Sequence, residues 1–193
     1  MFYTKLLGTY NIKLLSGNFI FSSISWLINA KYRRYSKLNT FLSRQVTNPH
    51  DRMINLAMSL AGKNSDKTVI NVVRWVKNNV SYKSEKSEEW KGAYQTMLDR
   101  DGDCDDMNCL VFTLCYLAGV NPFQLFCAIG DMTNGGHYWC MYYSTKEKKM
   151  VTLDTTYYAS TTSVKNRTDF NKLKYHKNIW YLFNDDICVK PLV

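Results

Sequence analysis

Three stretches of the chain repeat apolar residues at helical spacing. Two of them, residues 53–60 and 69–80, are separated by a polar break at Gly62, Asn64 and Ser65. A third runs from Cys104 to Ala118. The longest stripes are Val69, Val72, Val73, Val76 and Val80, and Met107, Leu110, Val111, Leu114 and Leu117. Apolar positions three and four apart fall on one side of a helix, so each stretch predicts a helix that buries one face.

Further along the chain the pattern becomes that of strands. Residues 137–143 form an apolar, aromatic run that follows two glycines, and residues 150–155 form a second run after a polar turn. Residues 160–176 are polar and predict irregular structure, and residues 179–189 predict a final strand. Helices followed by antiparallel strands favour an α+β fold.

The segment from Met1 to Thr47 stands apart from the rest. Residues 14–30 are rich in apolar side chains, but serines, asparagines and a glycine interrupt them, and no small-residue cleavage site follows. We therefore expect neither a membrane span nor a signal peptide. The expected organisation is an N-terminal arm or packing segment, 1–47, that contacts the domain or a partner, and a domain over residues 48–193. The apolar side chains available for such packing are Phe19, Phe21, Ile24, Trp26, Leu27 and Ile28.

Composition agrees with one folded domain and limits the classes of function. A chain of 193 residues with 46% hydrophobic and 15% aromatic residues can bury a sizeable core. The net charge is +9, but the lysines are spread in short runs, so the sequence does not indicate a nucleic-acid-binding surface. Six irregularly spaced cysteines suggest reduced thiols in the cytoplasm, or in a virion if a phage encodes the chain.

Cys104 lies in the run Asp-Arg-Asp-Gly-Asp-Cys-Asp-Asp, residues 99–106, at the start of the third predicted helix. Gly102 permits a sharp turn before it, and an aspartate can cap the free backbone N–H groups of the first turn. The positive end of the helix dipole lowers the pKa of a thiol there, whereas the flanking carboxylates raise it. A histidine partner is therefore needed to make a nucleophile.

His137 is the candidate partner, because it opens the aromatic strand, whereas His50 and His176 lie in polar stretches. If the centre of the following hairpin lies between Lys146 and Glu147, Asp154 is the diagonal neighbour of His137 on the same sheet face. A shift of one residue would place Asp154 on the opposite face. In the favourable register Asp154 can fix the imidazole tautomer and leave the other ring nitrogen for the Cys104 thiol.

These residues, read together, resemble the transglutaminase-like superfamily. The resemblance covers residues 65–160 and rests on Trp90-x-x-Ala93-x-Gln95-Thr96-x-Leu98, Gly102-Asp103-Cys104-Asp105-Asp106, Gly136-His137-Tyr138-Trp139 and Leu153-Asp154-Thr155-Thr156. It implies a papain-like arrangement in which a nucleophile helix packs on an antiparallel sheet. It also implies Cys104 as nucleophile, His137 as base and Asp154 as orienting acid. Gln95 is a candidate oxyanion donor, and the Cys104 backbone N–H is the alternative.

Several residues allow a second interpretation. Trp90 and Trp139 either line a substrate pocket or pack in the core. The other five cysteines lie in apolar surroundings typical of small buried hydrophobic residues. An EF-hand calcium loop is excluded, because its glycine would fall on Cys104 and its closing glutamate on Leu110. Zinc-ligand spacing and a phosphate-binding loop are also missing from the sequence, so we expect no metal or other cofactor.

The sequence thus predicts a cysteine hydrolase or acyltransferase that acts on an amide of a protein or peptide through a thioester, with water as the simplest acceptor. The superfamily also includes domains that have lost activity. The alternative is therefore a structural or assembly protein that keeps the fold, such as a phage virion component that assembles through residues 1–47.

Overall fold

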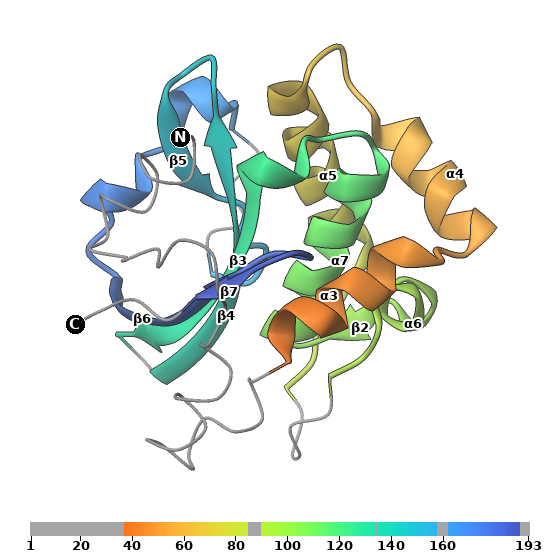
Figure 1. The fold of residues 1–193 in the computed structure, drawn as a ribbon, viewed down its shortest axis with the longest axis horizontal. Helices are drawn as coiled ribbons and strands as arrows, with labels where there is room; N and C mark the ends of the chain where they lie inside the picture. The colour runs from red at the N-terminus through yellow and green to blue at the C-terminus, as the bar shows by residue number, and fades with distance from the viewer. Residues whose placement is uncertain (1–36, 85–89, 134, 158–161, 190–193) are drawn as a thin grey trace.

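The computed structural model describes residues 37–84, 90–133, 135–157 and 162–189. For His176 and Lys177 it describes the backbone alone. Figure 1 shows two layers, a twisted sheet on one side and a group of helices packed against one of its faces. This is the α+β arrangement that the sequence predicts. In the described ranges no helix is both long enough and apolar enough to cross a bilayer.

The helical layer is formed by α3 (Leu38–Thr47), α4 (Asp51–Leu60), α5 (Ser65–Asn79), α6 (Ala93–Asp99) and α7 (Cys104–Leu117). Polar side chains cap the starts of three of them. At α4 the His50 ring accepts a hydrogen bond from the Arg52 backbone N–H at 3.3 Å. The Asn64 side chain accepts a hydrogen bond from the Lys67 backbone N–H at α5, and Asp103 does the same for Asp105 at α7. Helices α4 and α7 start and end within two residues of the predicted positions, whereas α5 starts four residues earlier than predicted.

Helix α7 lies at the centre of the helical layer. It contacts α3, α4, α5 and α6 as well as strands β3 and β4 of the sheet. All residues from Asp106 to Cys115 are buried. The sequence predicts one buried face, whereas the helix is enclosed on every side, which explains why apolar residues occupy most of its positions.

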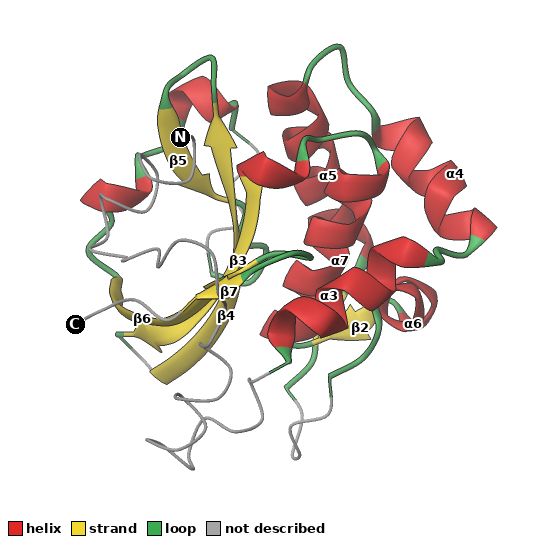
Figure 2. Ribbon diagram, in the orientation of Figure 1, coloured by secondary structure: helices red, strands yellow, loops and turns green. Residues whose placement is uncertain are grey.

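The sheet contains five antiparallel strands in the order β5-β4-β3-β6-β7 (Figure 2). Their bounds are β3 Leu125–Met132, β4 Gly135–Ser144, β5 Lys149–Thr152, β6 His176–Phe183 and β7 Cys188–Val189. The sequence predicts β4 and β5, and it merges β6 and β7 into one strand. It does not predict β3, the central strand.

Short elements complete the described fold. Strands β1 (Ser81–Tyr82) and β2 (Asp101–Gly102) pair in parallel beside the start of α7. The 3-10 helices are η3 (Pro122–Gln124), η4 (Val164–Asn166) and η5 (Phe170–Lys172). The last two interrupt the stretch that the sequence predicts to be irregular.

Residues 38–47 belong to the domain core. Leu38 and Leu42 of α3 are 2% and 0% exposed, and α3 contacts α7. This part of the predicted arm thus packs on the domain through an amphipathic helix. The apolar residues 19–28, which were expected to make such contacts, lie outside the described residues.

Apolar side chains fill both faces of the sheet. The larger cluster lies between the sheet and the helices, and a smaller one, which includes Trp139 and Phe170, lies on the other face. All six cysteines are free thiols. Cys109, Cys115, Cys127 and Cys140 are fully or almost fully buried, in agreement with their predicted role as small hydrophobic residues.

Candidate active site

Strands β4 and β5 pair in the register that brings His137 and Asp154 together. Tyr142 pairs with Val151 and Met141 with Thr152, so the hairpin centre falls between Lys146 and Glu147, which is the register that the sequence argument required. His137 Nε2 lies 2.7 Å from Asp154 Oδ2, and these side chains are only 2% and 0% exposed. The diagonal pair predicted from the hairpin is therefore present.

Asp154 accepts further hydrogen bonds from the backbone that follows it. The N–H groups of Thr156 and Tyr157 donate to its Oδ1 atom at 2.8 and 3.3 Å. Such a turn, in which an aspartate accepts from the next backbone amides, fixes the side chain without help from the rest of the protein. One carboxylate oxygen is thus held by the turn and the other by the His137 ring.

Arg167 supports the segment that carries Asp154. Its Nη1 atom donates to the carbonyl of Thr152, the last residue of β5, and its Nε donates to that of Thr162 at 3.3 Å. Burial lowers the pKa of Arg167 to about 10, and the charge of Asp154 opposes this shift. The arginine therefore joins the two ends of the loop after β5 while remaining cationic at neutral pH.

Cys104 is the first residue of α7 and is half-buried. Asn108, one turn further along, donates through Nδ2 to the carbonyls of Cys104 at 2.9 Å and Tyr138 at 3.1 Å. This buried amide ties the start of α7 to β4 at the residue that follows His137. The contact positions the thiol beside the sheet end that carries His137 and Asp154.

The electrostatic surroundings keep Cys104 protonated. Burial raises the pKa of its thiol to about 12, the Tyr138 backbone N–H lowers it, and the charges of Asp105, Asp103 and Asp154 raise it. Both Cys104 and His137 lie within the described ranges, and no hydrogen bond joins the thiol to the imidazole ring. In this state Cys104 is a protonated thiol and not a preformed thiolate.

Acidic side chains crowd the start of α7. One ligand atom from each of Asp103, Cys104 and Asp105 lies within 4.8 Å of the others. Burial, a hydrogen bond to Asp103 and the charges of Asp103 and Asp106 raise the pKa of Asp105 to about 9. Asp105 therefore keeps its proton at neutral pH.

Asp106 has a structural role at this helix start. It is fully buried, and its Oδ1 accepts from the Lys91 backbone N–H at 2.8 Å. Gly102 is required by close approach, because an added Cβ would lie 2.6 Å from the Asp106 Cβ. The sequence motif before Cys104 thus reflects tight packing as well as helix capping.

Two exposed tyrosines border the thiol and the His137 ring. Tyr157 is 54% exposed, and its ring contacts that of His137 edge-on with centroids 4.8 Å apart. Tyr82 in β1 is 53% exposed, and its pKa is raised by partial burial and by the proximity of Cys104 and Tyr157. These rings form the solvent-facing rim of the candidate site.

The residues proposed to bind substrate lie elsewhere or are covered. Trp139 is 0% exposed and stacks between His137 and Phe170, with centroid distances of 6.0 and 6.3 Å. Trp90 packs edge-on against Phe41 and Tyr138. For both tryptophans the structure therefore favours the core-packing interpretation.

Gln95 has a different partner from the one proposed for it. It is exposed on α6, and its Nε2 donates to Asp99 Oδ1 of the same helix at 2.6 Å. Within the described residues, no hydrogen bond joins Gln95 to Cys104 or His137. The backbone N–H of Cys104, the first residue of α7, has no hydrogen-bond acceptor within the helix, so it is the remaining candidate for the oxyanion donor.

Sequence reasoning missed Asn108, Tyr82, Tyr157 and Arg167. Asn108 left a signal, since it is a polar residue one turn after the cysteine in an otherwise apolar helix. The two tyrosines and Arg167 left none, because their roles depend on how β1 and the loop after β5 fold back on the site.

Comparison with known proteins agrees with this architecture. A family model for a transglutaminase-like domain matches residues 51–141, which include Cys104 and His137. No curated protein matches the chain in sequence.

Solved structures share the fold at low sequence identity. Calcium-bound LapG of Legionella pneumophila has a TM-score of 0.59 and 18% identity, covering 80% of this chain and 86% of LapG. EGTA-treated LapG has a TM-score of 0.56 and 17% identity, covering 88% of this chain and 82% of LapG. A third LapG structure gives the same score and identity, with 88% and 84% covered. The family model that matches residues 51–141, together with the helices packed on an antiparallel sheet, supports a transglutaminase-like fold for this chain.

Proposed function

We propose that this protein is a cysteine hydrolase that cleaves amide bonds in a protein or peptide through a thioester intermediate. The observation that carries the proposal is the buried His137–Asp154 pair, 2.7 Å apart, at the end of β4 that meets Cys104. A buried histidine with one nitrogen held by a carboxylate offers its other nitrogen to a neighbouring thiol. In this protein Nε2 is the held nitrogen, so Nδ1 is the base.

The reaction begins with proton transfer from the Cys104 thiol to His137 Nδ1. The sulfur attacks the substrate carbonyl carbon, and the negative charge moves to the carbonyl oxygen near the Cys104 backbone N–H. His137 then gives its proton to the leaving nitrogen, the C–N bond breaks, and an acyl-thioester remains on Cys104. Asp154 stabilises the protonated ring in both steps.

Water completes the cycle. His137 takes a proton from a water molecule, the hydroxide oxygen attacks the thioester carbon, and the sulfur leaves and recovers the proton. An amine in place of the water would give acyl transfer. Hydrolysis is the simpler proposal because it needs no second binding site.

The thiol pKa of about 12 makes base assistance necessary. A substrate that covers the rim between Tyr82 and Tyr157 would bring the thiol and the ring into contact, since catalytic hydrogen bonds often tighten only when substrate is bound. The substrate class proposed is an extended peptide whose side chain can rest on these two rings.

Calcium is a candidate effector, because LapG has been solved in a calcium-bound form. In this chain the carboxylates of Asp103 and Asp105 are hard oxygen ligands that suit calcium, whereas the Cys104 thiol does not. A cation held by these two carboxylates would reduce the negative charge beside Cys104. Its contribution would be electrostatic, and the proposed reaction steps remain those of Cys104 and His137.

The test is digestion of a mixed peptide library by the full chain, with cleavage products identified by mass spectrometry. Wild type should release new peptide ends, and Cys104→Ala should release none. Cys188→Ala is the matched control, because Cys188 is also half-buried and its pKa is also raised to about 12, by burial alone. Cleavage that survives in Cys104→Ala would reject the proposal.

Alkylation by iodoacetamide tests the histidine independently of substrate. The rate at Cys104 should fall in His137→Ala, whereas the rate at Cys188 should not change. If Cys104 reacts no faster than Cys188 and ignores the histidine, the fold serves a non-catalytic role.

A further inference from the structure

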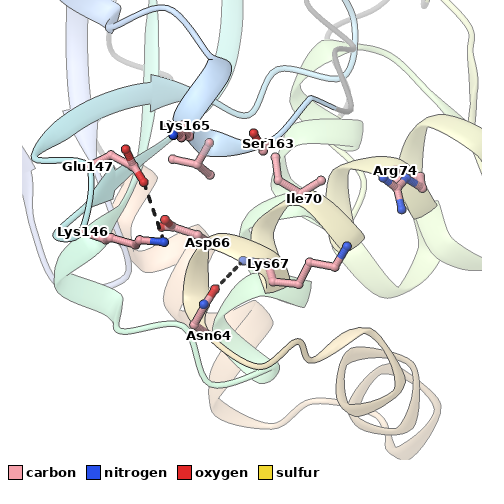
Figure 3. A pocket seen from close by; sticks show the side chains of 10 residues that line it. Asn64, Asp66, Lys67, Ile70, Arg74, Lys146, Glu147, Ser163 and Lys165 are labelled. Carbon is pink, nitrogen blue, oxygen red and sulfur yellow. Dashed lines mark hydrogen bonds and ion pairs between the residues drawn. The ribbon is translucent and has the colours of Figure 1, made fainter.

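A second concave site lies at the other end of the hairpin that carries His137. It encloses about 340 Å³ between the first turns of α5, the β4–β5 turn and η4 (Figure 3). Its basic lining residues are Lys67, Arg74, Lys146 and Lys165, and its acidic ones are Asp66 and Glu147. The lining therefore carries two net positive charges.

The acidic residues are engaged with the protein itself. Asp66 accepts hydrogen bonds from the Tyr142 hydroxyl at 2.9 Å and the Ser144 hydroxyl at 3.2 Å, one on each carboxylate oxygen. Glu147 lies 4.0 Å from Lys146, whose side chain is 74% exposed. Asp66 thus directs its charge toward the sheet, and Glu147 offsets one cation only weakly.

The remaining cations contrast with the lysines beside the candidate active site. Lys83 and Lys91 form ion pairs with Asp101 at 3.0 and 2.9 Å. In the described part of the chain, Lys67, Arg74 and Lys165 form no ion pair. Positive charge that the protein leaves unneutralised around a hollow is available to a negatively charged ligand.

We propose that this site binds an acidic segment of a polypeptide. Lys67 and Arg74 are separated by seven residues on one helix, which corresponds to roughly 10 Å along its axis. Carboxylates on alternate residues of an extended chain are roughly 7 Å apart, so a short acidic stretch can meet both cations and Lys165. Ile70 and Val164 also line the site, but they are only 4% and 2% exposed, so the cations supply the contacts to the acidic chain.

A compact anion fits the site less well. A phosphate group needs donors that converge on one point, and the backbone N–H groups of a helix start supply them most often. At α5 the Asn64 side chain already accepts from the Lys67 backbone N–H at 2.9 Å. The cations are instead spread along the helix and across two loops, which favours a chain of charges.

The location of this site suggests a link to the proposed cleavage at Cys104. This link rests on the proposed function, whereas binding of the acidic segment does not. Helix α5 leads from Lys67 toward β1, where Tyr82 borders Cys104. Its 15 residues span roughly 22 Å, so a substrate with an acidic segment about seven extended residues from the cleaved bond would occupy both sites. Binding of the acidic segment itself requires no chemistry at Cys104.

Fluorescence anisotropy with a labelled hexaglutamate peptide tests the proposal on the full chain at low ionic strength. Lys67→Glu/Lys165→Glu should weaken binding by at least about fivefold relative to wild type. Lys172→Glu/Lys174→Glu makes the same change of net charge at two exposed lysines outside the site, and it should change binding less than about twofold. Thermal unfolding of each variant confirms that it folds.

Three outcomes would overturn the proposal. Wild type could fail to bind hexaglutamate, or both double variants could lose affinity equally, which would indicate attraction to net charge alone. Inorganic phosphate could displace the peptide more effectively than chloride at equal ionic strength, which would indicate a small-anion site. Because the measurement needs no cleavage, an inactive Cys104 would leave each result unchanged.

Discussion

Asp154 and Asp105 lie on opposite sides of Cys104, and their surroundings have opposite effects on a carboxylate charge. Asp154 is fully buried and receives donors on both carboxylate oxygens, from His137, Thr156 and Tyr157. Asp105 instead faces a second carboxyl group, Asp103, and its pKa is raised to about 9. The sheet side of the site is built to hold a negative charge, and the helix side is built so that negative charge is unfavourable.

In the proposed mechanism this difference separates an oriented base from a thiol that has to be activated. A base that is already oriented needs no rearrangement, whereas a thiol with a pKa of about 12 needs its surroundings to change before it reacts. Substrate contact with His137, or neutralisation of the nearby carboxylates, would supply that change. Each variant below alters one side of Cys104 and leaves the other intact.

The largest effect is expected from Asp154→Asn. The amide can present its N–H₂ group to His137 and stabilise the wrong tautomer, so peptide cleavage should fall by roughly 10³–10⁴-fold. The matched Asp105→Asn variant, on the helix side, should not reduce cleavage. Rates on a peptide found in the library digest provide the measurement, and an equal loss in both variants would remove the distinction between the two acids.

The second largest effect is expected at Arg167, which holds the segment that carries Asp154, although within the described residues no hydrogen bond joins the two side chains. Arg167→Met leaves the carbonyls of Thr152 and Thr162 without their donor, so the free energy of unfolding should fall by about 2–3 kcal/mol. Arg52→Met, at an exposed arginine of α4, should change it by less than about 0.5 kcal/mol. Urea unfolding measures both. Equal stability of the two variants would mean that Arg167 does not hold the loop.

The sequence predicts the sheet side of this comparison better than the helix side. The sequence leaves two registers for the β4–β5 hairpin, and the pairing in the structure is the one that places Asp154 diagonal to His137. The relation is local, so no distant contact was needed to find it. The charge state of Cys104 depends instead on burial, which a helical pattern alone does not measure.

Strand β3 and Arg167 show the same limit. Leu125 to Ile129 are buried, so the strand has no clear alternation of apolar and polar positions. Arg167 lies in a polar stretch, and only the path of the loop after β5 turns its guanidinium inward. A strand buried on both faces gives a weak periodic signal. A side chain whose partners are distant in sequence gives none.

A smaller effect is expected when charge is removed from the helix side. Asp105→Asn removes a carboxyl group whose ionised form raises the pKa of Cys104. Because the pKa of Asp105 is about 9, the ionised form predominates above pH 9, so in the variant the pKa of Cys104 should fall from about 12 and the thiolate fraction at pH 10 should rise. A decrease of roughly one unit would increase the alkylation rate roughly tenfold. Asp186→Asn, at an exposed aspartate, is the control. An unchanged or slower rate in Asp105→Asn would show that burial alone sets the pKa.

Calcium should produce the same change in wild type, to a lesser degree. If Asp103 and Asp105 bind the cation, alkylation of Cys104 at pH 10 should be roughly threefold faster in millimolar calcium than in EGTA, because partial neutralisation favours the thiolate. Cys188 has no such carboxylate pair among the causes of its shifted pKa and serves as the internal control. In Asp105→Asn the calcium effect should disappear, since the cation loses one of its two ligands. A calcium response that persists in this variant, or that Cys188 shares, would place the cation elsewhere and leave the acidic pair with the structural role of starting α7.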